Sequence, residues 1–385
     1  MNYFLGLDFI RLILPAIGGC CLLNHLERFH RVFQFKEVDR VPDYEFGYWD
    51  ETIDRWHREG LPLEMKTNRD VELYLNLEGW DFIDMLPVVT GLWPPLPSRI
   101  IKEERDRMLI YDGMGGIYLA TKSTSSPPHY IKYPLRTRED WERLKPFFDP
   151  NTPGRFPLNW DEVVTAYRER EAPLGINVGS LYGWLRNLMG VQGISIAFYR
   201  DPDWVAEMMD TLVNLWISII RRALRSIKVD FATWWEDMCY NKGPLISVRH
   251  FEEFMVPRYR KVTDVLKEYG VTINIVDCDG DITRLVPGWL EGGINCMFPL
   301  EARCTDIYKL REQYGHKVLL MGGVDKRALI AGGNAIDKEL ERLTPLLKDG
   351  GYIPMVDHRC PPEVSYQTYL YYLKRKREWI GRYDV

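Results

Sequence analysis

The chain has 385 residues, of which 46% are hydrophobic, 13% aromatic and 27% charged, a composition typical of a globular protein with a large core. Its formal net charge of −5 and the lack of a Lys/Arg stripe argue against binding to nucleic acid. The seven cysteines are scattered and form no CxxC pair, so we expect no disulfide framework and favour a reducing cytoplasm.

An apolar run at residues 12–23 could be mistaken for a membrane or signal segment. It contains Pro15, Gly18 and Gly19 and is shorter than the roughly 20 apolar residues that a spanning helix needs. A basic leader and a small-residue cleavage site are also missing. We therefore expect residues 1–24 to be a docked or disordered extension, or the product of an upstream start codon, with a peripheral anchor as the alternative.

Residues 25–385 are expected to form one domain, because no repeat, low-complexity tract or flexible linker interrupts them. Short apolar or β-branched runs recur along this region and predict eight strands. These runs lie at 41–48, 81–86, 174–178, 230–235, 271–276, 294–298, 317–321 and 352–356.

Most of these runs are separated by predicted helices. The clearest helix begins at Asp201, an N-cap acid followed by Pro202, and its apolar residues recur every three or four positions up to Ile227. Another begins near Ser247 and ends at Gly270, and Pro257 should kink it. Shorter helices are predicted at 305–314, 334–348 and 363–379.

Strands that alternate with helices imply parallel pairing, either in a closed barrel or in an open doubly wound sheet. Neither a GxGxxG motif nor a GxxxxGK[ST] motif occurs, so the usual reasons for an open sheet are missing. We therefore predict a (β/α)8 TIM barrel. Alternating segments at 99–104, 109–112 and 116–121 predict an inserted β-hairpin between the second and third strands.

In such a barrel, the residues that follow the strands converge on one mouth. Most of these positions are acidic or aromatic, and one is a histidine. In chain order they are Tyr48, Trp49, Asp50, Asp84, Tyr182, Trp184, Trp235, Glu236, Asp237, Asp277, Cys278, Asp279, Gly280, Asp281, Glu301, Asp325, Lys326, Arg327, Asp357, His358, Arg359 and Cys360.

Carboxylates at a barrel mouth need a cation, a proton or a ligand, because burying an unpaired charge costs several kcal/mol. Glu236, Asp277, Asp279 and His358 form a candidate ligand set for a divalent ion such as zinc. The alternative is that an aspartate caps the next helix and His358 binds a backbone carbonyl. An EF-hand is rejected, because Gly288 stands where the loop needs a bidentate glutamate.

Aromatic side chains also crowd the predicted mouth and suggest an apolar or planar substrate, although several could simply fill the barrel. They are Tyr48, Trp49, Trp93, Tyr182, Trp184, Trp234 and Trp235.

Several motifs give the chain a resemblance to the uroporphyrinogen decarboxylase superfamily, and in particular to its methyltransferase-like, corrinoid-dependent bacterial branch. The resemblance covers roughly residues 25–380. It rests on residues 27–29, 38–42, 179–190, 236–238, 277–282 and 322–327, and on His358 with Pro361 and Pro362.

This resemblance independently implies a (β/α)8 barrel. Porphyrinogen-decarboxylating members carry an Arg-Gln-Ala-Gly-Arg segment after the first strand, whereas this chain has residues 45–51, with Glu45, Asp50 and Glu51. A polyanionic porphyrin would be repelled there. Asp84 and His358 fall where that class keeps a functional aspartate and histidine, so decarboxylation of a smaller organic or aromatic acid stays open.

Corrinoid-linked methyltransferases of the superfamily bind zinc through a His-x-Cys-Gly motif and a cysteine ahead of a Pro-Pro pair. At the matching positions this chain has Asp277, Asp279 and His358, aligned on Gly280 and Pro361. Oxygen and nitrogen ligands replace soft sulfur, which suits an ether or amine substrate better than a thiol acceptor.

The leading hypothesis is a methyltransferase that demethylates a small molecule, such as a methoxylated aromatic, and passes the methyl group to a corrinoid-binding protein. A metal at Asp277, Asp279 and His358 would polarise the leaving atom, with Glu236 as a further ligand or general acid. Asp84 would anchor the substrate. Substrate-binding residues are expected to be Tyr48, Trp49, Tyr182, Trp184, Trp235, Asp325 and Lys326.

Two alternatives remain at this point. One is a metal-free decarboxylase or lyase, in which His358 and Asp84 protonate and stabilise a carbanion-like intermediate. The other is a non-catalytic subunit that docks a corrinoid protein. Neither nucleic acid nor a membrane is expected as a partner, and a homodimer is compatible with the sequence.

Overall fold

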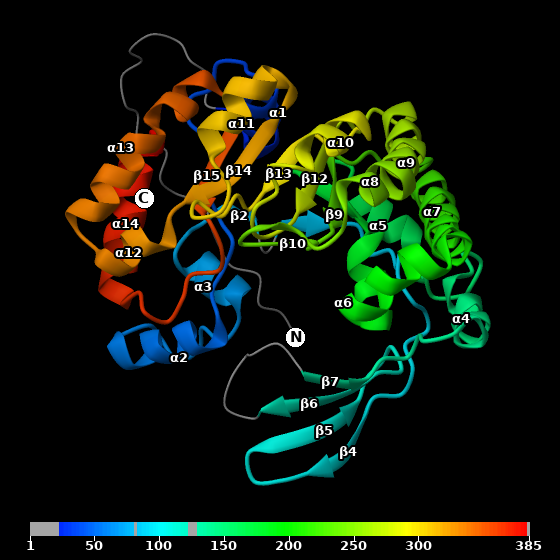
Figure 1. Ribbon diagram of the computed structural model, residues 1–385. Helices are drawn as coiled ribbons and strands as arrows, with labels where there is room; N and C mark the ends of the chain where they lie inside the picture. Colours follow the sequence, from blue (N-terminus) through cyan, green and yellow to red (C-terminus); the bar gives the residue numbers. More distant parts are fainter. Residues whose placement is uncertain (1–22, 81–82, 122–128, 383–385) are drawn as a thin grey trace, which may run out of the picture.

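A seven-stranded parallel sheet forms the centre of the molecule in the computed structural model, which describes residues 23–80, 83–121 and 129–382 (Figure 1). The strands are joined in the order β15-β14-β13-β12-β9-β8-β3. Their bounds are β3 Asp84–Met85, β8 Leu174–Gly179, β9 Phe231–Trp235, β12 Ile273–Asp277, β13 Cys296–Phe298, β14 Leu319–Val324 and β15 Tyr352–Val356.

The first strand of the chain closes this sheet into a barrel. β1 (Tyr44–Glu45) pairs in parallel with β2 (Gly79–Trp80), which leads into β3 along the chain. On its other side, Tyr48 forms a bridge with Cys360, whose N–H donates a 2.9 Å hydrogen bond to the carbonyl of Gly47. The (β/α)8 barrel is therefore confirmed. Residues 81–82 of the predicted second strand lie outside the described residues.

Side chains of the barrel strands alternate between the interior and the helix layer. Phe231, Ile273 and Met355 belong to the interior cluster, which α1 (His25–Phe33) plugs through Phe29. Their neighbours, such as Trp234, pack outward under the helices. Side chains alternate in this way because a β-strand is pleated, and the alternation shows which strand-end residues face the mouth.

Helices surround the barrel, as Figure 1 shows. The predicted helix at Asp201 is α7, and the Asp201 side chain accepts the hydrogen bond of its N-cap from the Trp204 N–H. Pro257 lies in the first turn of α9, and α9 directly follows a π-helical turn, Phe251–Met255. The expected irregularity of the helix therefore precedes the proline. The remaining bounds are α2 Asp50–Glu59, α3 Asn68–Tyr74, α4 Arg138–Leu144, α5 Trp160–Ala166, α6 Tyr182–Arg200, α7 Pro202–Leu224, α8 Val248–His250, α9 Val256–Glu268, α10 Val286–Glu291, α11 Ile307–Tyr314, α12 Lys326–Ala331, α13 Asn334–Asp349 and α14 Tyr366–Ile380.

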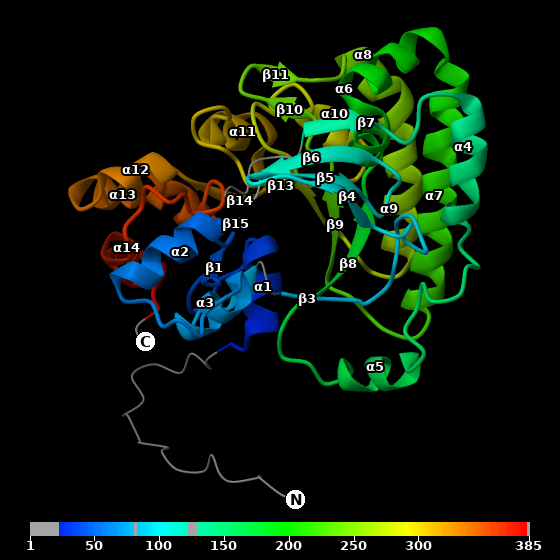
Figure 2. The same ribbon diagram turned by 90° about the horizontal axis from the view of Figure 1, so that it is seen from below.

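The insertion after β3 is a four-stranded antiparallel sheet in the order β4-β5-β6-β7, and so is larger than the expected hairpin. Its strands are β4 Arg99–Glu103, β5 Arg107–Tyr111, β6 Ile117–Thr121 and β7 His129–Lys132. Because the insertion leaves the carboxyl end of a barrel strand, it belongs to the mouth side of the barrel. Figure 2 shows it in front of the barrel strands.

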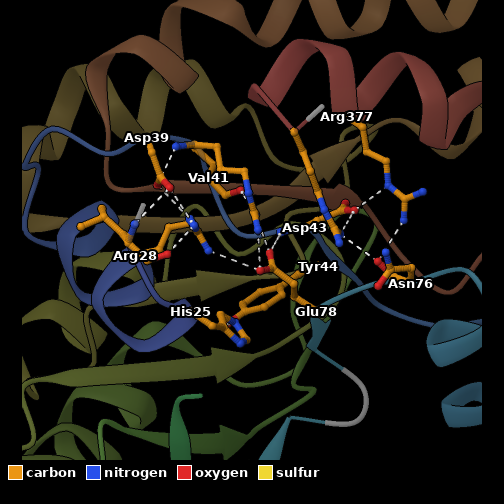
Figure 3. A network of polar contacts seen from close by, with 12 residues as sticks. His25, Arg28, Asp39, Val41, Asp43, Tyr44, Asn76, Glu78 and Arg377 are labelled. Carbon is orange, nitrogen blue, oxygen red and sulfur yellow. Dashed lines mark hydrogen bonds and ion pairs between the residues drawn. The ribbon is translucent and has the colours of Figure 1, made fainter. Parts of the chain in front are cut away.

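A buried ionic network ties the start of β1 to the last helix, and Figure 3 shows its part around Asp43, Glu78 and Arg377. The Lys376 Nζ of α14 lies 2.6 Å from Glu45 Oε1 and 3.2 Å from Asp43 Oδ1, and all three side chains are buried. Arg377 and Arg382 also pair with Asp43. Nearby, Arg28 binds Asp39, and Arg28 and Arg40 both bind Glu78, so the network explains several residues of the amino-terminal motif.

Of the predicted extension at residues 1–24, only the last two residues are described. Asn24 is the N-cap of α1 and accepts a hydrogen bond from the Glu27 N–H. Among the described helices, none is long and apolar enough to cross a membrane.

Candidate functional site

His358 and Asp279 form the centre of the candidate site. They follow β15 and β12, and His358 Nε2 lies 3.4 Å from Asp279 Oδ2. The imidazole stacks on Trp49, with ring centroids 5.4 Å apart, and meets the edge of Phe46 at 5.6 Å. The histidine is therefore oriented by one carboxylate and two aromatic rings, while 20% of its side chain stays exposed.

Asp277 ends β12 and continues the series of interior-facing residues Ile273 and Ile275. It lies in register between Trp235 of β9 and Phe298 of β13. Burial raises the pKa of the Asp277 carboxyl well above its ordinary range, and the negative charges of Asp279 and Asp237 raise it further.

The interior beside Asp277 is open to solvent. Asn177 of β8 lies between Ile176 and Val178, which both pack outward, so its own side chain faces the interior, where it is exposed. Its partner in the register, Thr233 of β9, is half-buried. Asn177 and Thr233 therefore offer polar groups to a molecule that enters the mouth.

A second ionic group borders the site at Lys326. Its ammonium lies 2.8 Å from Glu301 Oε1 and 3.8 Å from Asp357 Oδ1. Burial raises the pKa of Asp357 to about 6, although hydrogen bonds from the Ala302 and Lys326 N–H groups favour its ionised form. Lys326 is thus held at the mouth by neighbouring carboxylates.

Gly280 is needed for the turn that carries Asp279. Its φ is +83°, and an added Cβ would lie 2.6 Å from the carbonyl oxygen of Tyr240. The Gly280 N–H donates a 2.9 Å hydrogen bond to Glu301 Oε2, which joins the turn to the group around Lys326. The acidic stretch at residues 277–281 is therefore a constrained turn at the mouth.

Two arginines also lie here, Arg359, which was among the predicted strand-end residues, and Arg186, which was not. Arg186 reaches from α6 to Asp237 Oδ2 at 2.7 Å, and its guanidinium lies 5.2 Å from the ring centroid of Trp235. Arg359 lies over the ring of Phe46, and its positive charge acts on Asp277. The strand-end rule therefore found Arg359, whereas Arg186 lies within a helix, where that rule does not apply.

Glu236 has a different position from the one expected for a general acid or metal ligand. It is fully buried, and its carboxylate accepts hydrogen bonds from the Ser180 hydroxyl and the N–H groups of Leu181 and Tyr182 at 2.9–3.0 Å. These groups begin α6. The structure therefore makes Glu236 an anchor for that helix and gives it no access to a substrate.

Asp84 also lies away from the mouth. It pairs in register with Leu174, the first residue of β8. Its neighbours Ile83 and Met85 pack in the barrel interior, so Asp84 lies on the helix side, where its charge raises the pKa of Tyr167 in addition to the effect of burial. The expected role as a substrate anchor has no support from this position.

Several of the predicted substrate-binding side chains have structural contacts instead. Tyr48 is buried with its hydroxyl 3.1 Å from that of Tyr369, and Tyr182 is completely buried. Trp184 packs against Trp216, and Asp325 caps α12 and pairs with Arg327. The structure brings Trp49, Trp235 and Lys326 to the site, together with Asp277, Asp279 and His358.

The predicted metal ligands are only partly assembled. Asp279 and His358 are adjacent, and Asp279 Oδ1 has no hydrogen-bond partner among the residues that the structure describes. Asp277 is also crowded by like charges, and a cation would relieve both features. Within the described ranges, however, no three His, Cys, Asp or Glu side chains are grouped closely enough to hold a metal ion. We therefore derive no reaction step from a metal.

Comparisons with known proteins agree with this fold. A family model described as uroporphyrinogen decarboxylase (URO-D) matches residues 108–379. Uroporphyrinogen decarboxylase of Klebsiella pneumoniae (strain 342) is 24% identical over 297 residues, which cover 71% of this chain and 76% of that protein. The Salmonella dublin protein of that name is 27% identical over 297 residues, with coverage of 70% and 76%.

Among solved structures, a methyltransferase from Methanosarcina mazei is similar, with a TM-score of 0.57 and 14% sequence identity. The match covers 94% of this chain and 100% of that one. At this identity the likeness shows a shared fold.

Proposed function

Since the chain belongs to the uroporphyrinogen decarboxylase family and is an enzyme of that superfamily, we propose that it is a methyltransferase. It removes the methyl group from a methylated small molecule, such as a methoxylated aromatic compound, and passes it to a corrinoid protein. The observation that carries this proposal is His358 at the mouth, which lies beside Asp279 and contacts the rings of Phe46 and Trp49.

The aromatic side chains support a planar substrate. Phe46, Trp49 and Trp235 come from two different strand ends and are all half-buried, so part of each ring is accessible. A ring placed against them would gain apolar contact and stacking of about 0.5–1.5 kcal/mol per aromatic pair. Asn177 and Thr233 could orient polar substituents.

Demethylation of an ether requires protonation of the leaving oxygen. The corrinoid partner would supply the nucleophile, and the O–CH3 bond would break with its electron pair remaining on oxygen. His358 is the proton donor in this proposal, because its partly exposed imidazole lies at the mouth and is oriented by the Asp279 carboxylate at 3.4 Å. The products are then an alcohol or phenol and a methylated corrinoid protein.

Decarboxylation of a small organic or aromatic acid is the second candidate. It is favoured by the names of the curated relatives and by the cationic side chains of Lys326, Arg186 and Arg359, which could bind a carboxylate. In that reaction the C–COO⁻ bond breaks, carbon dioxide leaves, and His358 protonates the carbanion that remains.

The test compares the wild type with His358→Ala, using a panel of methoxylated aromatics and cob(I)alamin as the methyl acceptor. We expect wild-type methylcobalamin formation, and a reduction of kcat/KM by about 100-fold or more in the variant, the usual range for loss of an acid–base group. His316→Ala, with 59% of the original side chain exposed, is the matched control. Equal rates in the wild type and His358→Ala would contradict the proposal. Carbon dioxide release from the demethylated acids would favour the second candidate.

A divalent metal, with zinc as the first choice, stays a prediction from Asp277, Asp279 and His358. Bound there, it would act as a Lewis acid on the leaving atom. This prediction expects about one zinc per chain by mass spectrometry of the metal content, and loss of that zinc in Asp279→Ala but not in Asp281→Ala. A wild-type protein that remains metal-free after incubation with zinc would make the prediction wrong.

A further inference from the structure

A cavity outside the mouth lies where the inserted sheet meets α6. Its volume is about 870 Å³. Its walls are residues 131–133 and 135–138, at and just after the end of β7, together with residues of α6 and the start of α7. Figures 1 and 2 both show β7 next to α6, and the Leu135 N–H donates a 3.0 Å hydrogen bond to the Leu188 carbonyl. None of the residues of the candidate site line this cavity.

A break in α6 shapes one wall. Gly190 has φ +74° and ψ 160°, which are not helical values, and an added Cβ would lie 2.6 Å from the ring of Tyr133. The glycine lets Tyr133 pack against the helix at this break. The cavity is therefore bounded by a fixed contact between the inserted sheet and α6.

The lining is strongly cationic for a protein with a net charge of −5. Four basic side chains and one carboxylate, Asp201, contribute to it. Arg138 is already paired with Asp201 at 2.6 Å. The other three bases, Lys132, Arg136 and Arg200, form no ion pair within the part of the chain that the structure describes, and they are exposed.

Apolar side chains complete the lining and remain accessible. Ile131, Val191 and Ile196 are 60%, 42% and 41% exposed, whereas Leu135 and Ala197 form the buried wall. Large apolar side chains that gather at a concave surface are typical of a ligand site. The volume also lies within the range of about 300–1,000 Å³ that small-molecule sites have.

We propose that this cavity binds an amphipathic polyanion, a small molecule with an apolar body and two or more phosphate, sulfonate or carboxylate groups. The apolar body would lie against Val191 and Ile196, and the anionic groups would pair with Arg136, Arg200 and Lys132. Arginine provides several donors in a plane and suits phosphate and carboxylate oxygens. This site is independent of the proposed methyl transfer.

The test uses bis-ANS, a fluorescent dye with two sulfonate groups on an aromatic body, titrated into the full chain. The double variant Arg136→Glu/Arg200→Glu is expected to weaken dye binding at least tenfold. Both arginines are exposed, so their replacement removes no core contact. Circular dichroism of each variant checks that the fold is kept.

Matched variants distinguish this cavity from other dye sites. Lys338→Glu/Lys374→Glu makes the same change of charge at exposed positions of α13 and α14, and we expect it to change the dissociation constant less than twofold. Ile196→Ser should weaken binding as well, because it removes apolar contact. His358→Ala should leave dye binding unchanged.

Unchanged binding in Arg136→Glu/Arg200→Glu would overturn the proposal. Equal weakening in the Lys338→Glu/Lys374→Glu control would overturn it too, because binding would then follow net charge alone. Loss of binding in His358→Ala would place the dye at the mouth instead and would have the same consequence.

Discussion

His25 lies beside the first barrel strand, with its Nε2 2.6 Å from the hydroxyl of Tyr44. Burial lowers the pKa of this histidine to about 4. The nearby positive charges of Arg28 and Arg40 lower it as well, whereas Glu78 acts in the opposite direction. The folded protein therefore favours the neutral imidazole.

The sign of the resulting pH dependence follows from that shift. Below a pH of about 6.5 the unfolded chain protonates His25 while the folded chain does not, so the folded state loses stability as the pH falls toward 4. We expect wild type to lose up to about 3 kcal/mol relative to His25→Gln over this interval. Urea denaturation at pH 7.5 and pH 4.5 measures the difference.

His316→Gln provides the control for this measurement, because 59% of the His316 side chain is exposed. The difference in stability between this control and the wild type should change little with pH. If wild type and His25→Gln lose stability in parallel as the pH falls, the assigned role of His25 is wrong.

At the same scale, the sequence predicts strand-end residues well but not the direction of each side chain. Trp235 and Asp277 face the mouth because they continue the interior-facing series of their strands. Asp84 and Glu236 each stand one residue away from an interior-facing position of their strand. Because side chains alternate along a strand, they therefore point to the opposite face. Arg186 reaches the site from a helix, where no strand-end rule applies.

At the scale of elements, β-branched and apolar runs were sufficient to predict the strands of the barrel. The strand predicted at 41–48 is shorter in the structure, where only Tyr44–Glu45 pairs along its edge with β2. β7 was missed because its four residues are mostly exposed and lack an alternating apolar pattern. Such a strand depends on its neighbour in the sheet more than on its own composition.

α6 was not predicted as a helix, and its composition explains why. It contains Gly183, Gly190 and Gly193, and each glycine in a helix interior costs about 1 kcal/mol relative to alanine. Tertiary contacts compensate: the buried Glu236 carboxylate binds the first N–H groups of the helix, and Tyr133 fills the space at Gly190. Contacts with residues that are distant in the sequence therefore determine that this segment is a helix.

For the whole molecule, we expect the stability of the fold to depend on Lys376, which joins the first barrel strand to the last helix. Its ammonium is completely buried and pairs with Glu45 and Asp43 from the other end of the sequence. Lys376→Met would leave the Glu45 carboxylate buried without a cation, and we expect a loss of about 3–5 kcal/mol in the free energy of unfolding. Chemical denaturation of both proteins at pH 7.5 measures this loss.

The matched control is Arg249→Met, which breaks the exposed pair of Arg249 with Glu253. A surface pair of this kind contributes about 0–1 kcal/mol, so the control should remain close to the wild type. Equal stabilities of Lys376→Met and Arg249→Met would show that the buried network does not stabilise the fold.

The positions of these charged residues in the sequence also affect when the barrel can assemble during translation. Glu45 and Lys376 are separated by 331 positions, so the first strand leaves the ribosome long before its buried cation has been translated. Until α14 emerges, Asp43 and Glu45 have no partner on that helix, and the edge of the nascent barrel stays open. We therefore expect the apolar residues of the barrel interior to stay accessible until α14 has been translated, and exposed apolar surface of this kind is what chaperones bind.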